Sequence, residues 1–141
     1  MTRAAARPRK AEPARQALLI LDLISRYEFD DWRAVLRAAL DVAPRIARLR
    51  ERAHRADVPV IYVNDTEGRW EADQAAFVRR CVADDARGHR VVRQLAPAAR
   101  DYFVFKPKHS GFYATPLVEL LRRLGSEELI LTGLTSHQCV L

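Results

Sequence analysis

Four short apolar segments separated by helical stretches most strongly constrain what this chain can fold into. The first, residues 17–21, is a continuous apolar run that ends at Asp22. A run of this length without polar interruption is typical of a strand buried on both faces of a parallel sheet. The other three predicted strands are residues 58–63, 102–105 and 128–133. Parallel strands need crossover segments between them, and helices usually supply these crossovers.

The segments between the predicted strands have helical spacing. Asp31 is expected to cap a long helix over residues 32–56, which Pro44 either kinks or splits in two. Further helices are predicted over residues 74–82 and 116–124. Residues 84–97 are expected to form a loop with a short apolar piece in it.

This alternation predicts an α/β fold, namely a three-layer α/β/α arrangement around a parallel sheet with right-handed crossovers, similar to the Rossmann fold. The length of 141 residues corresponds to one domain. In sheets of this kind, functional sites form at the carboxyl ends of the strands. Chemically active residues at those ends are therefore the first candidates.

The basic charge of the chain is concentrated at its start. Residues 1–16 hold five basic residues against Glu12, so they carry +4 of the formal net charge of +6. We expect these residues to form a disordered basic tail and the folded domain to cover residues 17–141. The small charge excess of that domain argues against a nucleic-acid partner, with weak anion binding by the tail as the alternative.

The composition excludes several classes of protein. Apolar residues make up 49% and charged residues 30% of the chain, and no apolar run is long enough to span a membrane, so no membrane partner is expected. Two cysteines far apart do not make a disulfide framework, which favours a cytoplasmic location. Cys81 lies in a stretch with helical spacing and is predicted to be a buried structural thiol.

Four residues whose side chains could take part in catalysis follow the predicted strand ends: Asp22, Asp65, Lys106 and Cys139. A carboxylate can take the proton of a thiol nucleophile, and a lysine can keep that carboxylate ionised. Backbone N–H groups of the turn before Cys139 can stabilise an oxyanion. The pattern alone also fits a helix cap, a surface charge and a buried thiol.

Three segments resemble, in the same order, the motifs of the isochorismatase-like cysteine hydrolases. Residues 18–23 resemble the opening strand of that family. Lys106 is followed four residues later by Ser110, a small residue and Phe, as in the family's lysine segment. Residues 131–140 follow the pattern Thr-Gly-x-x-Thr-x-x-Cys-Val of its nucleophile segment. The resemblance covers residues 17–141.

The resemblance implies a cysteine-dependent hydrolase that acts on a small molecule, with an amide-like C–N bond as its target and a thioester-type intermediate. It implies Asp22 as general base, Lys106 as its charged partner and Cys139 as nucleophile. The backbone N–H groups of Thr135 and Cys139 are the implied oxyanion hole, with a cis peptide bond between Leu134 and Thr135. Hydrolysis of a vinyl ether is the alternative reaction, and the sequence does not identify the substrate.

The chain departs from the family at the residues around the predicted pocket. The loop of residues 64–70 has no histidine, so we expect neither a metal ion nor another cofactor. Asp65 and Glu67 in this loop are expected to be solvated or capping groups. Tyr27 and Trp70 are candidates either for lining the substrate pocket or for packing.

The largest departure is at the end of the chain, where only two residues follow Cys139. On this ground the domain is expected to lack its final strands and to be truncated relative to the family. A carboxylate close to the thiol would oppose its ionisation, so a weakly active or inactive form is expected. The alternative function is then an inactive remnant that acts as a binding or interaction protein. For a complete chain the resemblance implies a homo-oligomer.

The histidines offer a second enzyme hypothesis. His109 or His137 would be the base for Cys139 in a cysteine–histidine dyad. His137 is two residues from Cys139, and side chains at that spacing on a helical turn do not face each other. His109 would need its loop to fold inward.

Overall fold

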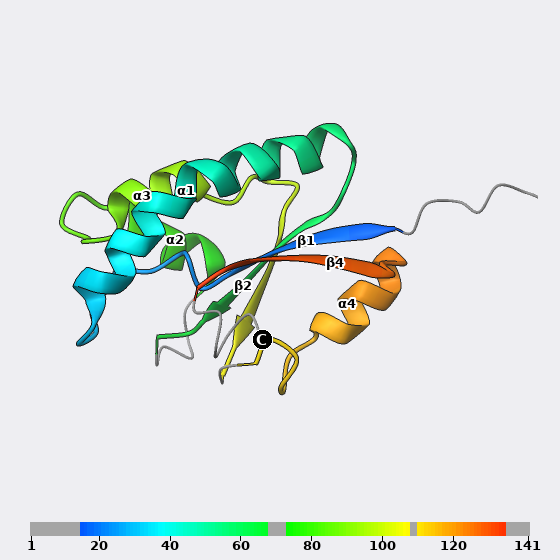
Figure 1. The fold of residues 1–141 in the computed structure, drawn as a ribbon. Helices are drawn as coiled ribbons and strands as arrows, with labels where there is room; N and C mark the ends of the chain where they lie inside the picture. Colours follow the sequence, from blue (N-terminus) through cyan, green and yellow to red (C-terminus); the bar gives the residue numbers. More distant parts are fainter. Residues whose placement is uncertain (1–14, 68–72, 108–109, 135–141) are drawn as a thin grey trace, which may run out of the picture.

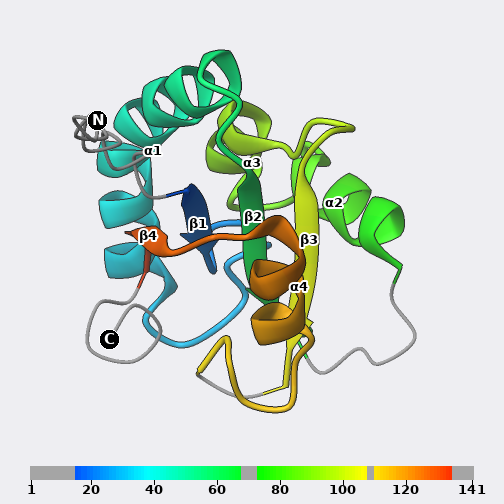
Figure 2. The same cartoon turned by 90° about the vertical axis from the view of Figure 1, so that its right-hand side faces the viewer.

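The computed structural model describes residues 15–67, 73–107 and 110–134, and its centre is a four-stranded parallel sheet (Figure 1). The strands are β1 (Gln16–Leu21), β2 (Val60–Asp65), β3 (Tyr102–Lys106) and β4 (Glu128–Gly133). Their order in the sheet is β3-β2-β1-β4, which Figure 2 shows from right to left. The predicted α/β fold with a parallel sheet is confirmed.

Helices cover both faces of the sheet. The helices are α1 (Trp32–Arg55), α2 (Gln74–Val82), α3 (His89–Leu95) and α4 (Leu117–Leu124). Figure 1 shows α1, α2 and α3 on one face and α4 on the other, which gives the three predicted layers. None of the helices that the structure describes has both the length and the apolar character needed to span a lipid bilayer.

α1 runs without a break through Pro44, so a split of this helix was the wrong expectation. Pro44 lies on the exposed side of the helix, whereas Ala43 and Ile46 are buried. A proline removes one backbone hydrogen bond, and on an exposed side water can satisfy the carbonyl that loses its partner. Asp31 precedes the helix but makes no capping hydrogen bond with its side chain.

The segment predicted as a loop over residues 84–97 contains the helix α3, which is a second correction. Its seven residues bury Val91, Val92 and Leu95 against the core. Such a short helix with two β-branched residues has weak intrinsic propensity, so tertiary packing decides its conformation. Short segments of this kind give little periodic signal.

The bounds of the other elements agree closely with the predictions. α2 and β4 have the predicted residues, and β1 begins one residue earlier, at Gln16. β2 begins at Val60 because Pro59 has no N–H for the sheet, although its carbonyl accepts from Leu18 N at 2.9 Å. The predicted tail lies outside the described residues except for Arg15 and Gln16.

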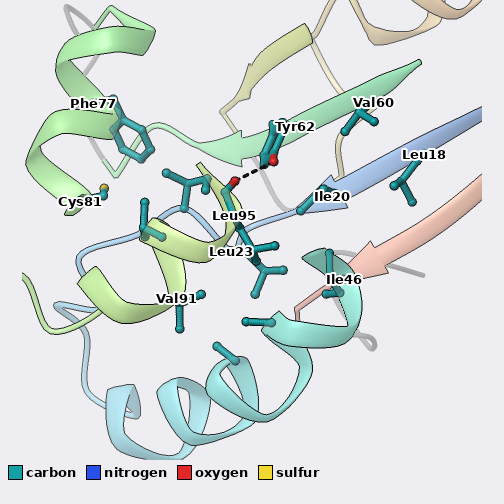
Figure 3. Close-up of a cluster of buried hydrophobic side chains, with 14 of the residues drawn as sticks. Leu18, Ile20, Leu23, Ile46, Val60, Tyr62, Phe77, Cys81, Val91 and Leu95 are labelled. Atoms are coloured by element: carbon teal, nitrogen blue, oxygen red, sulfur yellow. Dashed lines mark hydrogen bonds between the residues drawn. The ribbon is translucent and has the colours of Figure 1, made fainter. Parts of the chain in front are cut away.

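The sheet separates two apolar clusters. Even-numbered residues of β1 and β2, such as Leu18, Ile20 and Tyr62, face the larger cluster under α1, α2 and α3 (Figure 3). Odd-numbered residues such as Leu19 and Ile61 face the smaller cluster under α4. Because successive strand residues point to opposite faces, a strand buried on both faces is apolar throughout.

One polar link crosses the larger cluster. The Tyr62 hydroxyl donates to the Leu95 carbonyl at 2.6 Å (Figure 3). It also accepts from Arg50 Nη1 at 3.0 Å. Arg50 also donates to the carbonyls of Gln94 and Ala96, at the end of α3. The last carbonyls of a helix have no hydrogen-bond donors within the helix, and the Arg50 guanidinium supplies donors for these two. This link ties α1, β2 and α3 together.

We expect Tyr62→Phe to lower the free energy of unfolding by about 1–2 kcal/mol, because it removes a buried hydrogen bond and leaves the Leu95 carbonyl without its donor. Chemical denaturation measures this change. Tyr102→Phe is the matched control, since that side chain is exposed and its stability effect should be negligible. Equal stability of the Tyr62→Phe variant and the wild type would contradict the structural role of the link.

Candidate active site

An ion pair joins the carboxyl ends of β1 and β3. Lys106 Nζ lies 3.0 Å from Asp22 Oδ2, and the Lys106 side chain is 1% exposed while that of Asp22 is 17% exposed. Lys106 is the last residue of β3, and Asp22 directly follows β1. Two of the four candidates from the strand ends are therefore brought into contact across β2, which lies between these strands.

The backbone around Asp22 holds its carboxylate in place. Asp22 has a φ of 55°, which turns the chain away from the strand direction. Its N–H donates to the Val63 carbonyl at 3.0 Å, and its Oδ1 accepts from Asp65 N at 3.0 Å. Asp tolerates this left-handed conformation better than most residues, at some cost in free energy. Asp22 therefore presents one oxygen to Asp65 and the other to Lys106.

The identity of the cation at this position is informative. The chain has 24 basic residues, of which three are lysine and the others arginine. Lysine carries a compact ammonium with three donors on a flexible stem, whereas arginine carries a planar guanidinium with a fixed fork of donors, so the two are not interchangeable in a close contact. A buried ammonium needs an anion close by, because its charge is costly to bury alone. Asp22 supplies that anion.

β4 ends beside Asp22. Leu134 N donates at 3.1 Å to the carbonyl of Leu21, the residue that directly precedes Asp22. Gly133 has a φ of 123°, and a Cβ there would lie 2.1 Å from the Leu21 carbonyl oxygen. Only glycine allows this approach. The chain that leads to residues 135–141 therefore departs next to the ion pair.

Several predicted site residues lie outside the described residues. These are Thr135 and Cys139, with the predicted cis peptide bond that ends at Thr135, and also Trp70, His109 and His137. Their roles stay predictions.

The loop after β2 contributes more than the sequence indicated. Asp65 Oδ1 accepts from Glu67 N at 2.6 Å, which agrees with the expected capping role of Asp65. Glu67 is not simply solvated, because its carboxylate accepts a hydrogen bond from Ser25 Oγ at 2.7 Å. Asn64 is 2% exposed and donates to the Ile24 carbonyl, while its Oδ1 has no hydrogen-bond partner among the described residues. Sequence reasoning missed Ser25 and Asn64, since neither stands in a recognisable motif.

Tyr27, a candidate for the substrate pocket, is 1% exposed. Its hydroxyl donates to the Leu23 carbonyl at 3.2 Å. Its ring lies against Gly88, where an added Cβ would be 2.3 Å from Tyr27 Cδ2. Burial is the main cause that raises the pKa of Tyr27. This placement favours a packing role over contact with a substrate.

Cys81 is 1% exposed, which confirms the predicted burial of this thiol. Burial raises its pKa to about 12, so the thiolate is very scarce at neutral pH. Buried thiols of this kind are chemically inert. Cys81 is a structural residue.

Within the described ranges, no three His, Cys, Asp or Glu side chains are grouped so that they could hold a metal ion. What the described part offers instead is the Asp22 carboxylate beside the buried amino group of Lys106, at the sheet edge where β4 ends. Such a carboxylate can accept a proton from a neighbouring group, and the ammonium stabilises negative charge near it.

Comparisons with known proteins find relatives in sequence and in structure. The family model named isochorismatase domain matches residues 16–141. An uncharacterized isochorismatase family protein of Bacillus subtilis, YaaI, is 38% identical over 128 residues, which are 91% of this chain and 70% of that protein. Enterobactin synthase component B of Escherichia coli is 30% identical over 129 residues, 89% of this chain, but the chain spans only 45% of that longer protein.

A solved structure with the same fold is that of N-carbamoylsarcosine amidase from Thermoplasma acidophilum. It superposes with a TM-score of 0.66 at 26% identity and covers 89% of this chain and 71% of its own. The parallel sheet with helices on both faces is thus shared with a hydrolase of this kind.

We expect Lys106→Met to lower the free energy of unfolding by about 3 kcal/mol, because it leaves the Asp22 carboxylate largely buried without its cation. The double variant Asp22→Asn, Lys106→Met should recover most of this loss, since it removes both charges and the Asn oxygen can still accept from Asp65 N. Denaturant unfolding of the single and double variants tests the pair. Equal losses in both variants would show that the two charges are not coupled.

Proposed function

The chain belongs to the isochorismatase family, and from this premise we propose that it is a cysteine-dependent hydrolase that cleaves an amide-like C–N bond of a small molecule. Members of this family are hydrolases that act on small molecules. The choice of a C–N bond is supported by the likeness to N-carbamoylsarcosine amidase. The finer assignment of substrate and residues is our proposal.

One observation carries the proposal: the buried ion pair between Asp22 and Lys106 at the carboxyl edge of the sheet. Asp22 and Lys106 are 84 positions apart in the chain and meet there, and β4 ends at the same edge of the sheet. Burying a lysine is costly, so a packed apolar side chain at this position would serve stability at least as well. A functional demand on the ammonium explains its retention.

In the proposed mechanism Asp22 is the general base. Its carboxylate takes the proton from the Cys139 thiol, and the thiolate sulfur attacks the carbonyl carbon of the substrate. A C–S bond forms and the π electrons of the carbonyl move to its oxygen. The N–H groups of Thr135 and Cys139 are the proposed donors to this oxyanion.

Collapse of the tetrahedral intermediate breaks the C–N bond, and Asp22 returns the proton to the leaving nitrogen. A water molecule then attacks the thioester with Asp22 again as the base, which releases the acid and regenerates the thiol. Lys106 is the proposed charged partner of Asp22, since its Nζ lies 3.0 Å from the carboxylate that receives the proton.

We expect Cys139→Ser to reduce kcat by at least about 1,000-fold, because the hydroxyl is a far poorer nucleophile than the thiolate. Release of ammonia or amine from N-carbamoyl amino acids, ureido compounds and primary amides measures the activity, with a vinyl-ether substrate assayed in parallel. Cys81→Ala is the matched control and should keep wild-type turnover, since Cys81 is buried in the larger apolar cluster. Turnover that survives Cys139→Ser would refute the proposed nucleophile.

Reactivity of the two thiols gives a test that needs no substrate. We expect iodoacetamide to alkylate Cys139 much faster than Cys81 near neutral pH, because burial raises the pKa of Cys81 to about 12. Mass spectrometry of proteolytic fragments locates the label. Asp22→Asn should slow the labelling of Cys139 alone. Equal labelling rates at both thiols would contradict an activated Cys139.

A further inference from the structure

Glu67 joins the loop after β2 to the loop after β1. Its carboxylate is partly buried against Ser25 Oγ, which donates to it at 2.7 Å, although the residue as a whole is exposed. Ser25 Oγ also accepts from Tyr27 N at 2.9 Å. A hydroxyl has one hydrogen, so the Ser25 hydrogen points to Glu67.

The same residue is tied to Asp22 through its own backbone. Glu67 N donates to Asp65 Oδ1 at 2.6 Å, and Asp65 N donates to Asp22 Oδ1 at 3.0 Å. The contacts therefore close a ring: from Asp22 through Asp65 to Glu67, and from Glu67 through Ser25 back to the segment that begins at Asp22. Each end of this short segment is held by the loop after β2.

Three of the five described residues other than glycine that have a positive φ lie in this ring or beside it. Asp22, Tyr27 and Glu67 have φ values of 55°, 58° and 52°, in the left-handed region that residues other than glycine adopt at a cost. Strained residues persist only where surrounding contacts over-determine them. Gly88 contributes by leaving room for the Tyr27 ring, since a Cβ at Gly88 would also lie 2.5 Å from the Ser25 carbonyl oxygen.

We propose that Glu67 is a positioning residue: through its contacts with Ser25 and Asp65 it holds the loop after β1 so that the Asp22 carboxylate is aligned for its role as base. Glu67 does not take part in the proton transfer itself. The inference rests on the proposed function, because alignment matters only if Asp22 is the base.

Comparison of Glu67→Gln with Glu67→Ala tests the proposal. The glutamine keeps an acceptor oxygen for the Ser25 hydroxyl, so Glu67→Gln should stay close to the wild type in kcat and in the pH profile of kcat/KM. Glu67→Ala should lower kcat by about 10- to 100-fold with KM nearly unchanged, as a misaligned catalytic group does. Ser25→Ala should resemble Glu67→Ala, because it removes the other partner of the same hydrogen bond.

Glu28→Gln is the matched control. Glu28 lies in the loop after β1 and pairs with Arg26 on the surface, at 2.8 Å. Loss of its charge should leave kcat unchanged. Equal loss of activity in Glu67→Gln and Glu67→Ala would overturn the proposal, because charge rather than position would then be what matters.

A stability measurement separates failure of this inference from failure of the proposed function. In a double-mutant cycle of Ser25→Ala and Glu67→Ala, the double variant should lose less in Tm than the sum of the single losses, since both changes remove the same contact. Additive losses in Tm would refute the coupling of Ser25 with Glu67, and with it the positioning role of Glu67, even if Cys139-dependent turnover is found. Absence of Cys139-dependent turnover in the wild-type chain would refute the proposed function and, with it, the role of Glu67 in aligning Asp22. Non-additive Tm losses in the double-mutant cycle would in that case still show that Ser25 and Glu67 are in contact.

Discussion

β1 is hydrogen-bonded along its length to β2 on one side and to β4 on the other, and this parallel pairing determines where every candidate group can lie. Because the strands are parallel, their carboxyl ends meet at one edge of the sheet. Pairing of Leu21 with both Val63 and Gly133 brings the residues that follow these strands together next to Asp22. β3 pairs in turn with β2 and brings Lys106 to the same edge. A shift of one residue in any of these pairings would also exchange the two apolar clusters, so the core and the site share one register.

The ion pair at this edge is costly to bury and is a weak source of stability in itself. Removing two charges from water costs free energy that their attraction only partly offsets. Lys106 is 1% exposed, and its side chain replaces one that could have been apolar, like the residues of the neighbouring strands. Burial of apolar surface in the surrounding core offsets this free-energy cost. Leu117 and Leu121 of α4 and the apolar residues of β1 and β2 contribute that surface.

The sequence was sufficient to predict the elements whose residues carry a strong local signal. Continuous apolar runs predicted the strands, and β4 has the predicted bounds, while family motifs pointed to Asp22 and Lys106 before their contact was known. The signal failed where tertiary packing decides the conformation. α3 forms because Val91 and Leu95 are buried and Arg50 binds its last carbonyls, and neither contact is visible as a local pattern. The Ser25–Glu67 contact was missed for the same reason, since its partners are 42 residues apart.

Left-handed backbone conformations of residues other than glycine occur at the site and also elsewhere among the described residues, as at Asp57 and Ala114. Asp57 also has a positive φ, but it directly follows the cap of α1, where a left-handed residue is the ordinary way to end a helix. Asp22 ends no helix, and a glycine there would relieve the strain of its φ of 55°. That glycine would also remove the carboxylate that faces Lys106 and Asp65. The strain therefore stands at a position where the side chain makes both contacts, and the hydrogen bonds with neighbouring segments are what make the conformation tolerable.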